Sequence, residues 1–138
     1  MKVFKFGGAS VKNAEGVKNV LTVLKTTEEK DLVVIVSAMG KMTNQLELII
    51  SNYFSSPNEV KASITEIYDF HFQIISDLFS NTSNPIFNLL LRYKNELHFF
   101  LENNKSNDHS FVYDQVVSFG ELISTSIISA YLSDKGLE

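Results

Sequence analysis

The chain has 138 residues, of which 44% are hydrophobic and 20% charged, and its formal net charge is −4 at pH 7. This length fits one globular domain or one part of a larger one. A negative charge without basic clusters argues against a nucleic-acid-binding protein, because a phosphate backbone requires a positively charged surface. The chain contains no cysteine, which excludes disulfides and thiolate metal sites.

The sequence also lacks the usual signals of secretion and membrane insertion. Its first eight residues contain no apolar core of a signal peptide. The apolar run at 32–36 is far too short to span a bilayer. We therefore expect a soluble, cytoplasmic protein whose partners include neither membranes nor nucleic acid.

The first 36 residues predict one strand–helix–strand unit. Residues 3–6 are β-prone and end at a pair of glycines, which is typical of a strand followed by a sharp turn. Apolar residues then recur at helical spacing up to Leu24, with Asn13 predicted as the N-cap. The unbroken apolar run at 32–36 favours a strand that is buried on both faces of a parallel sheet. Together these elements form a βαβ unit.

From residue 41 onward the pattern becomes helical. We expect a helix capped by Thr43 or Asn44, a second helix that ends near Phe79, and a third that begins at Pro85. The last helix should run over about 111–133.

Two glycines should mark this last helix. Gly120 predicts a kink or break within it, and Gly136 a left-handed residue at its end. The chain thus has two predicted strands and five predicted helices. Because two strands form a poor sheet alone, the pattern indicates that further strands come from a longer chain or from a partner.

The glycine loop after the first strand is a candidate phosphate site. Small residues let the backbone approach a phosphate closely, and free N–H groups in such a turn form an anion-binding concavity. Lys5 would add a positive charge beside Gly7 and Gly8, and Ser10 a hydroxyl donor. The spacing matches neither the Walker A loop nor G-x-G-x-x-G. A simple tight turn also uses paired glycines, and the local sequence leaves both interpretations open.

Two other segments could contribute to the same site. The loop at 37–44 follows the second strand and should lie beside the first loop, because ligands collect at the carboxyl ends of parallel strands. Glu121 follows Gly120 on the last helix, where a carboxylate is usually only a solvated side chain. His71, His98 and His109 have no metal-ligand spacing, so no protein metal site is expected.

Three blocks of the sequence resemble the aspartate kinase family. Lys-Phe-Gly-Gly-Ala-Ser-Val at 5–11 resembles the family's opening Lys-Phe-Gly-Gly-Thr-Ser-Val signature. Residues 34–46 are similar to its second block, and residues 118–125 to its Gly-Glu-(Leu/Arg)-x-Ser block. The blocks occur in family order and are spread from one end of the chain to the other. The resemblance implies an α/β, partial amino-acid kinase fold with few parallel strands and a helix-rich second half.

The resemblance also implies a reaction and a role for each candidate residue. The intact enzyme would transfer the ATP γ-phosphate to the side-chain carboxylate of L-aspartate, in amino-acid biosynthesis, with Mg²⁺ bridging the ATP phosphates. Lys5 would steady the transferring phosphoryl group, which makes it the catalytic candidate. Glu121 would accept a hydrogen bond from the substrate ammonium group. The remaining candidates would bind ATP phosphates (Gly7, Gly8, Ser10 and Ser37) or aspartate (Thr43).

Two departures from the family pattern qualify these expectations. Ala9 stands where the family has threonine, so one hydroxyl contact is absent although backbone contacts are retained. Residues 1–138 correspond only to the N-terminal portion of the catalytic domain, without the nucleotide-base half and the regulatory ACT domains. We therefore expect the isolated chain to have negligible kinase activity and to expose apolar surface that favours self-association, for example at Tyr93, Phe99 and Phe100.

Two alternatives remain at this point. One is another amino-acid kinase, acting on glutamate or acetylglutamate, which shares the first glycine-rich loop. The other is a non-catalytic interaction module that keeps the fold without the chemistry. The retained Lys5, Ser37, Thr43 and Glu121 argue against the second alternative.

Overall fold

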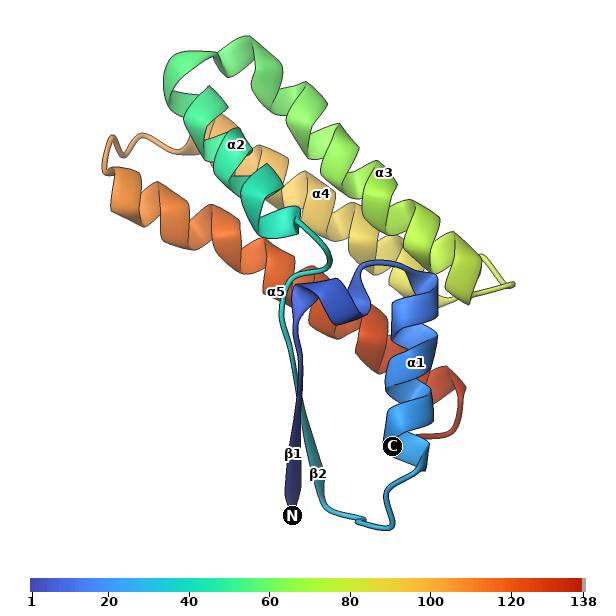
Figure 1. The fold of residues 1–138 in the computed structure, drawn as a ribbon. Coiled ribbons are helices and arrows are strands. Elements are labelled where there is room, and N and C mark those ends of the chain that lie inside the picture. The colour runs from blue at the N-terminus through green and yellow to red at the C-terminus, as the bar shows by residue number, and fades with distance from the viewer. Residues whose placement is uncertain (138) are drawn as a thin grey trace.

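The computed structural model describes residues 1–137, which form two parallel strands, five α-helices and two short 3₁₀ helices (Figure 1). The elements in chain order are β1 (Lys2–Phe6), η1 (Gly8–Val11), α1 (Ala14–Lys25), β2 (Leu32–Val36), α2 (Met42–Ser55), η2 (Pro57–Glu59), α3 (Val60–Leu78), α4 (Pro85–Asn103) and α5 (His109–Asp134). This architecture confirms the predicted α/β class and the helix-rich second half.

The two strands form a parallel sheet that is covered on one face only. Alternate side chains of the strands pack into the core with α1 and α5 (Phe4, Phe6, Leu32, Val34 and Val36). On the opposite face Val3, Val33 and Ile35 are 57%, 42% and 48% exposed. The prediction that the second strand is buried on both faces is therefore wrong for the part of the chain described here. Its apolar outer residues meet no second layer of helices.

Local capping explains where several helices begin. The Asn13 side chain accepts a hydrogen bond from the Gly16 N–H, as predicted, and Asn84 caps α4 with Pro85 in the first turn. Helix α2 differs from the prediction, because it begins at Met42 and places Thr43 and Asn44 inside its first turn rather than at the cap.

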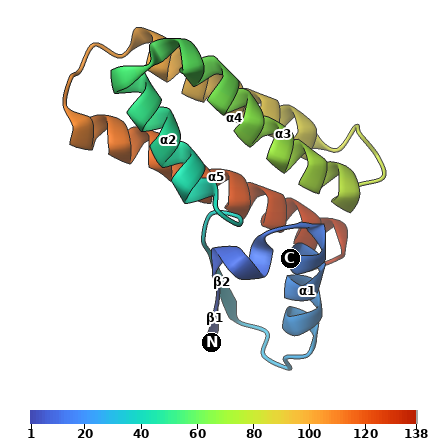
Figure 2. The same ribbon diagram turned by 45° about the horizontal axis from the view of Figure 1, so that its top comes forward.

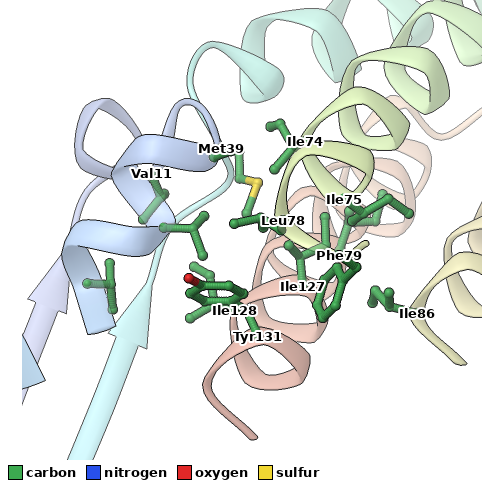
Figure 3. Close-up of a cluster of buried hydrophobic side chains, with 14 of the residues drawn as sticks. Val11, Met39, Ile74, Ile75, Leu78, Phe79, Ile86, Ile127, Ile128 and Tyr131 are labelled. Carbon is green, nitrogen blue, oxygen red and sulfur yellow. The ribbon is translucent and has the colours of Figure 1, made fainter. Parts of the chain in front are cut away.

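Helices α2 to α5 pack as a bundle whose core has two parts (Figure 2). At one end, α3, α4 and α5 meet the sheet and α1 in a cluster that includes Met39, Ile74 and Ile127 (Figure 3). At the other end, Leu46 of α2 and Val116 of α5 belong to a second cluster with residues of α3 and α4. The bundle thus anchors α5 against the loop that follows β2.

Helix α5 combines a long apolar stretch with a central place in this bundle. It is long and apolar enough to cross a membrane by length and composition alone. In the structure, however, it packs against α2 and α4, and Val112, Val116 and Ile127 on it are completely buried. These apolar side chains of α5 belong to the core, whereas Phe111 and Leu122 on the same helix are 43% and 48% exposed.

Candidate active site

The two glycine-containing loops meet at the carboxyl ends of β1 and β2, as predicted. The Gly40 N–H donates to the Gly8 carbonyl oxygen at 2.9 Å, and the Ser37 N–H donates to the Phe6 carbonyl oxygen at 3.1 Å. A Cβ on Gly8 would lie only 2.7 Å from the carbonyl oxygen of Ala38. Gly40 itself has φ of +56°, a left-handed conformation that favours glycine. The loops are therefore in direct backbone contact.

Helix α5 forms the third side of this junction. The hydroxyl of Ser124 donates to the Ser37 carbonyl oxygen at 2.7 Å. A Cβ on Gly120 would lie 2.9 Å from Ala38 Cβ and 3.0 Å from Leu46 Cδ1. The sequence predicted a kink or break at Gly120, and the break is wrong, because helix α5 continues through this residue without interruption. The glycine instead allows the helix to approach the loop closely.

Some candidate residues lie in the junction, some beside it, and two on neighbouring parts of β1 and α2. Gly8 and Ser37 lie in it and are half-buried, whereas Gly7 and Ser10 are exposed beside it. Glu121 is exposed and directly follows Gly120, which contacts the second loop. Lys5 lies on the uncovered face of β1, opposite Ile35, and Thr43 is half-buried in the first turn of α2.

Gly7 and Gly8 have different structural requirements. Gly7 has φ of −75° and ψ of 167°, an extended conformation that any residue adopts, and a Cβ there would meet nothing within 4 Å. Gly8 has no room for a side chain because two backbone carbonyl oxygens face it. A tight turn or close packing therefore explains the glycine at 8 but not the one at 7.

Gly8→Ala should lower the free energy of unfolding by about 1–3 kcal/mol, because overpacking against backbone forces the two loops apart. Gly7→Ala is the matched control and should leave stability unchanged or raise it by about 0.4–1 kcal/mol. Urea unfolding followed by circular dichroism measures both. Equal stability of the two variants would show that the loops move apart without strain.

Sequence reasoning assigned no role to Gly16 or to Ser124. A Cβ on Gly16 would lie 2.4 Å from the Ser10 carbonyl oxygen, so this glycine holds α1 close to the first loop. Ser124 belongs to the block that contains Glu121, three residues further along the helix. That spacing places both on neighbouring turns of one helix face, and it is the signal that could have identified Ser124.

A groove lies elsewhere on the molecule. It has a volume of about 780 Å³ and runs between α4 and α5, where Asn84, Arg92 and Ser126 line it, and none of the candidate residues does. Within residues 1–137, no group of three or more His, Cys, Asp or Glu side chains is placed to hold a metal ion. The candidate residues lie in or around the loop junction and not along this groove.

Comparison with known proteins gives a consistent result. Residues 1–138 match the amino acid kinase family. Aspartokinase 1 of Arabidopsis thaliana, a chloroplastic protein, is 34% identical over 142 residues that cover 99% of this chain and 24% of that protein. Aspartokinase of Rickettsia conorii is 41% identical over 58 residues, which cover 41% of this chain and 14% of that protein.

Solved structures agree on the fold. Aspartokinase III of Escherichia coli, in complex with lysine and aspartate, superimposes with a TM-score of 0.82 at 25% identity, covering 99% of this chain and 29% of that one. The same enzyme with aspartate and ADP gives 0.80 at 24% identity, covering 96% and 29%. The chain thus spans less than a third of the proteins it matches along its whole length. It belongs to the amino acid kinase family.

Proposed function

We propose that this chain is the part of an aspartate kinase that holds the ATP phosphates and the substrate ammonium group. The observation that supports this most directly is the junction of both glycine loops with α5. Gly8 contacts the backbone at Ala38 and Gly40, and Ala38 in turn contacts Gly120, the neighbour of Glu121. Residues from three distant parts of the sequence therefore surround one end of the sheet.

The phosphate side of the proposed site consists of backbone and hydroxyl donors. The open space at Gly7 supports close approach of a ligand to the backbone there, and Ser10 and Ser37 supply one hydroxyl group in each of the two loops. Lys5 supplies the positive charge for the transferring phosphoryl group. Phosphoryl transfer relies mainly on positioning and charge neutralisation, so such groups account for much of the catalysis.

Mg²⁺ would bind at this site together with ATP, through the phosphate oxygens. Magnesium usually keeps several waters and binds substrate phosphates together with one or two carboxylates, rather than an all-protein cage. The loops offer donors for phosphate and no carboxylate cluster, which fits an ion held by the phosphate oxygens. When bound, the ion would neutralise the charge that develops on the phosphates.

The substrate side consists of Thr43 and Glu121. The Glu121 carboxylate is exposed and makes no salt bridge within residues 1–137, so it is available to a ligand ammonium group. Thr43 lies on α2, whose first turn follows directly on the loop at Ser37–Lys41. The proposed substrate is L-aspartate, which the aspartokinase III structures also contain.

The complete reaction requires more polypeptide than this chain contains. One face of the sheet is uncovered, and the relatives matched along the whole chain are at least three times as long. We therefore propose that residues 1–138 form the N-terminal portion of the catalytic domain, without turnover of their own, in a cytoplasmic enzyme. Self-association remains a prediction that Phe99, 68% exposed on α4, supports.

Isothermal titration of the 138-residue chain tests the two half-sites separately. Gly7→Ala should weaken MgATP binding by about tenfold while leaving the fold intact, because the added methyl group occupies space that a phosphate needs. Glu121→Gln should weaken aspartate binding by about tenfold to a hundredfold, the range of one hydrogen bond to a charged group.

The control for the aspartate titration is an exposed residue away from the junction. Glu66→Gln on α3 should bind aspartate as the wild type does. Glutamate and acetylglutamate, titrated in parallel, distinguish the related amino-acid kinases. Tighter binding of either one than of aspartate would reject aspartate as the substrate, and a wild-type chain that binds none of these ligands would favour a non-catalytic module.

A further inference from the structure

Ser124 makes a hydrogen bond that is unusual for a serine inside a helix. Helical serines commonly bond back to the carbonyl of the preceding turn. Ser55, Ser63 and Ser76 of this chain do so, each to the carbonyl oxygen four residues earlier. Ser124 is completely buried and donates instead to the Ser37 carbonyl oxygen, 87 residues away, at 2.7 Å.

This hydrogen bond holds the peptide with which the second loop begins. The Ser37 N–H is paired with the Phe6 carbonyl oxygen of β1, and its carbonyl is paired with Ser124. Both backbone groups of Ser37 are therefore held, one by the sheet and one by α5. The next residues of the loop contact Gly120 at Ala38 and the first loop at Gly40, so the orientation of the Ser37 peptide sets the geometry of the junction.

We propose that Ser124 is a positioning residue that fixes the phosphate-binding loops relative to the substrate-binding helix. Glu121 precedes it by three residues on the same helix, so one rigid element carries both the proposed contact to the substrate and the anchor of the phosphate loop. The spacing between acceptor and donor substrates then depends on this helix. The inference rests on the proposed function, because it assigns the loops to phosphate and Glu121 to the substrate.

A purely structural role is the alternative, and Ser63 provides a matched control for it. Ser63 is also buried, and its hydroxyl donates to the Glu59 carbonyl oxygen at 3.1 Å in the α2–α3 region, away from the loops. Ser124→Ala removes one buried serine hydrogen bond, whereas Ser63→Ala removes the bond to Glu59 and a second bond that Ser63 accepts from the Asn52 side-chain amide at 3.1 Å. Both variants should unfold at lower urea concentration than the wild type.

Of the two alanine variants, only Ser124→Ala should weaken MgATP binding and loosen the contact between the two loops. We expect its MgATP affinity, measured by titration of the 138-residue chain, to fall by about fivefold, which corresponds to one neutral hydrogen bond. The Gly40 amide, which donates to Gly8, should exchange its hydrogen at least about tenfold faster in Ser124→Ala than in Ser63→Ala.

Ser124→Cys keeps the side-chain volume and a weaker hydrogen-bond donor, and should give intermediate values in both measurements. It also replaces the alanine variant if that variant does not fold.

The outcomes separate this inference from the proposed function. Equal affinity and equal Gly40 exchange in the two alanine variants would overturn the positioning role. If the wild-type chain does not bind MgATP, the phosphate assignment falls, and the exchange comparison alone decides the role of Ser124. Faster exchange specific to Ser124→Ala would then uphold the positioning of the loop, and its absence would reject it.

Discussion

Replacing Lys5 with methionine should lower the turnover of an enzyme that contains this chain by about 10²–10³, the scale of one preorganised electrostatic donor. Lys5 is exposed on the uncovered face of β1 and makes no salt bridge within residues 1–137. Its loss should therefore leave the fold almost unchanged, because surface substitutions away from special features usually alter stability by less than about 0.5 kcal/mol. The variant should thus lose turnover while its free energy of unfolding stays almost unchanged.

The measurement uses a chimera in which this chain replaces the matching part of Escherichia coli aspartokinase III. Aspartate-dependent ADP release, followed with coupling enzymes, reports turnover, and urea unfolding of the 138-residue variants reports stability. Lys2→Met is the matched control, because Lys2 lies at the opposite end of the same strand. A similar loss of turnover in both variants would contradict a specific role for Lys5. The 138-residue chain alone should release no ADP above background.

The second large effect concerns His71, which should make the fold less stable as the pH falls from 6.5 to about 4. His71 is completely buried on α3, and its Nδ1 lies 2.8 Å from the Ile67 carbonyl oxygen. Because a carbonyl only accepts, Nδ1 must carry the proton, and Nε2 has no hydrogen-bond partner among residues 1–137. Burial lowers the pKa of His71 from 6.5 to about 4, and the hydrogen bond to Ile67 only partly opposes that shift.

The sign of the pH dependence follows from these pKa values. Between pH 6.5 and about 4, the unfolded chain binds a proton at His71 and the folded chain does not. Acidification therefore favours unfolding, and the contribution is present above pH 6.5 and lost as the pH falls toward 4. At about 1.4 kcal/mol for each pH unit, the total loss is about 3 kcal/mol.

Urea unfolding at several pH values tests this prediction with two variants. His71→Gln should flatten the pH dependence in this window, because the titrating group is removed. His98→Gln should retain it, since His98 is partly exposed beside Glu102. Identical pH profiles for wild type and His71→Gln would contradict the assignment of the acid sensitivity to His71.

Local sequence determined much of the secondary structure and the family. The N-cap at Asn13, the helix start at Pro85 and the left-handed Gly136 were predicted correctly because each depends on backbone groups within a few residues. The three sequence blocks likewise indicated the family, since they carry the loops and the Gly-Glu pair. The cap of α2 was predicted wrongly because Thr43 and Asn44 fit the local cap pattern, whereas the helix begins earlier, at Met42, with both residues in its first turn.

Tertiary packing decided which strand face is covered and how the loops meet α5, since these features depend on contacts between residues far apart in the chain. The apolar run of β2 predicts burial, but which face is covered depends on where α1 and α5 lie. Gly120 has the same local signature as a helix break, and only the approach of Ala38 shows that it serves close packing. Long-range contacts also decide that Gly8 has no room for a side chain while Gly7 does. The hydrogen bond from Ser124 to Ser37 is likewise a long-range contact that local spacing does not encode.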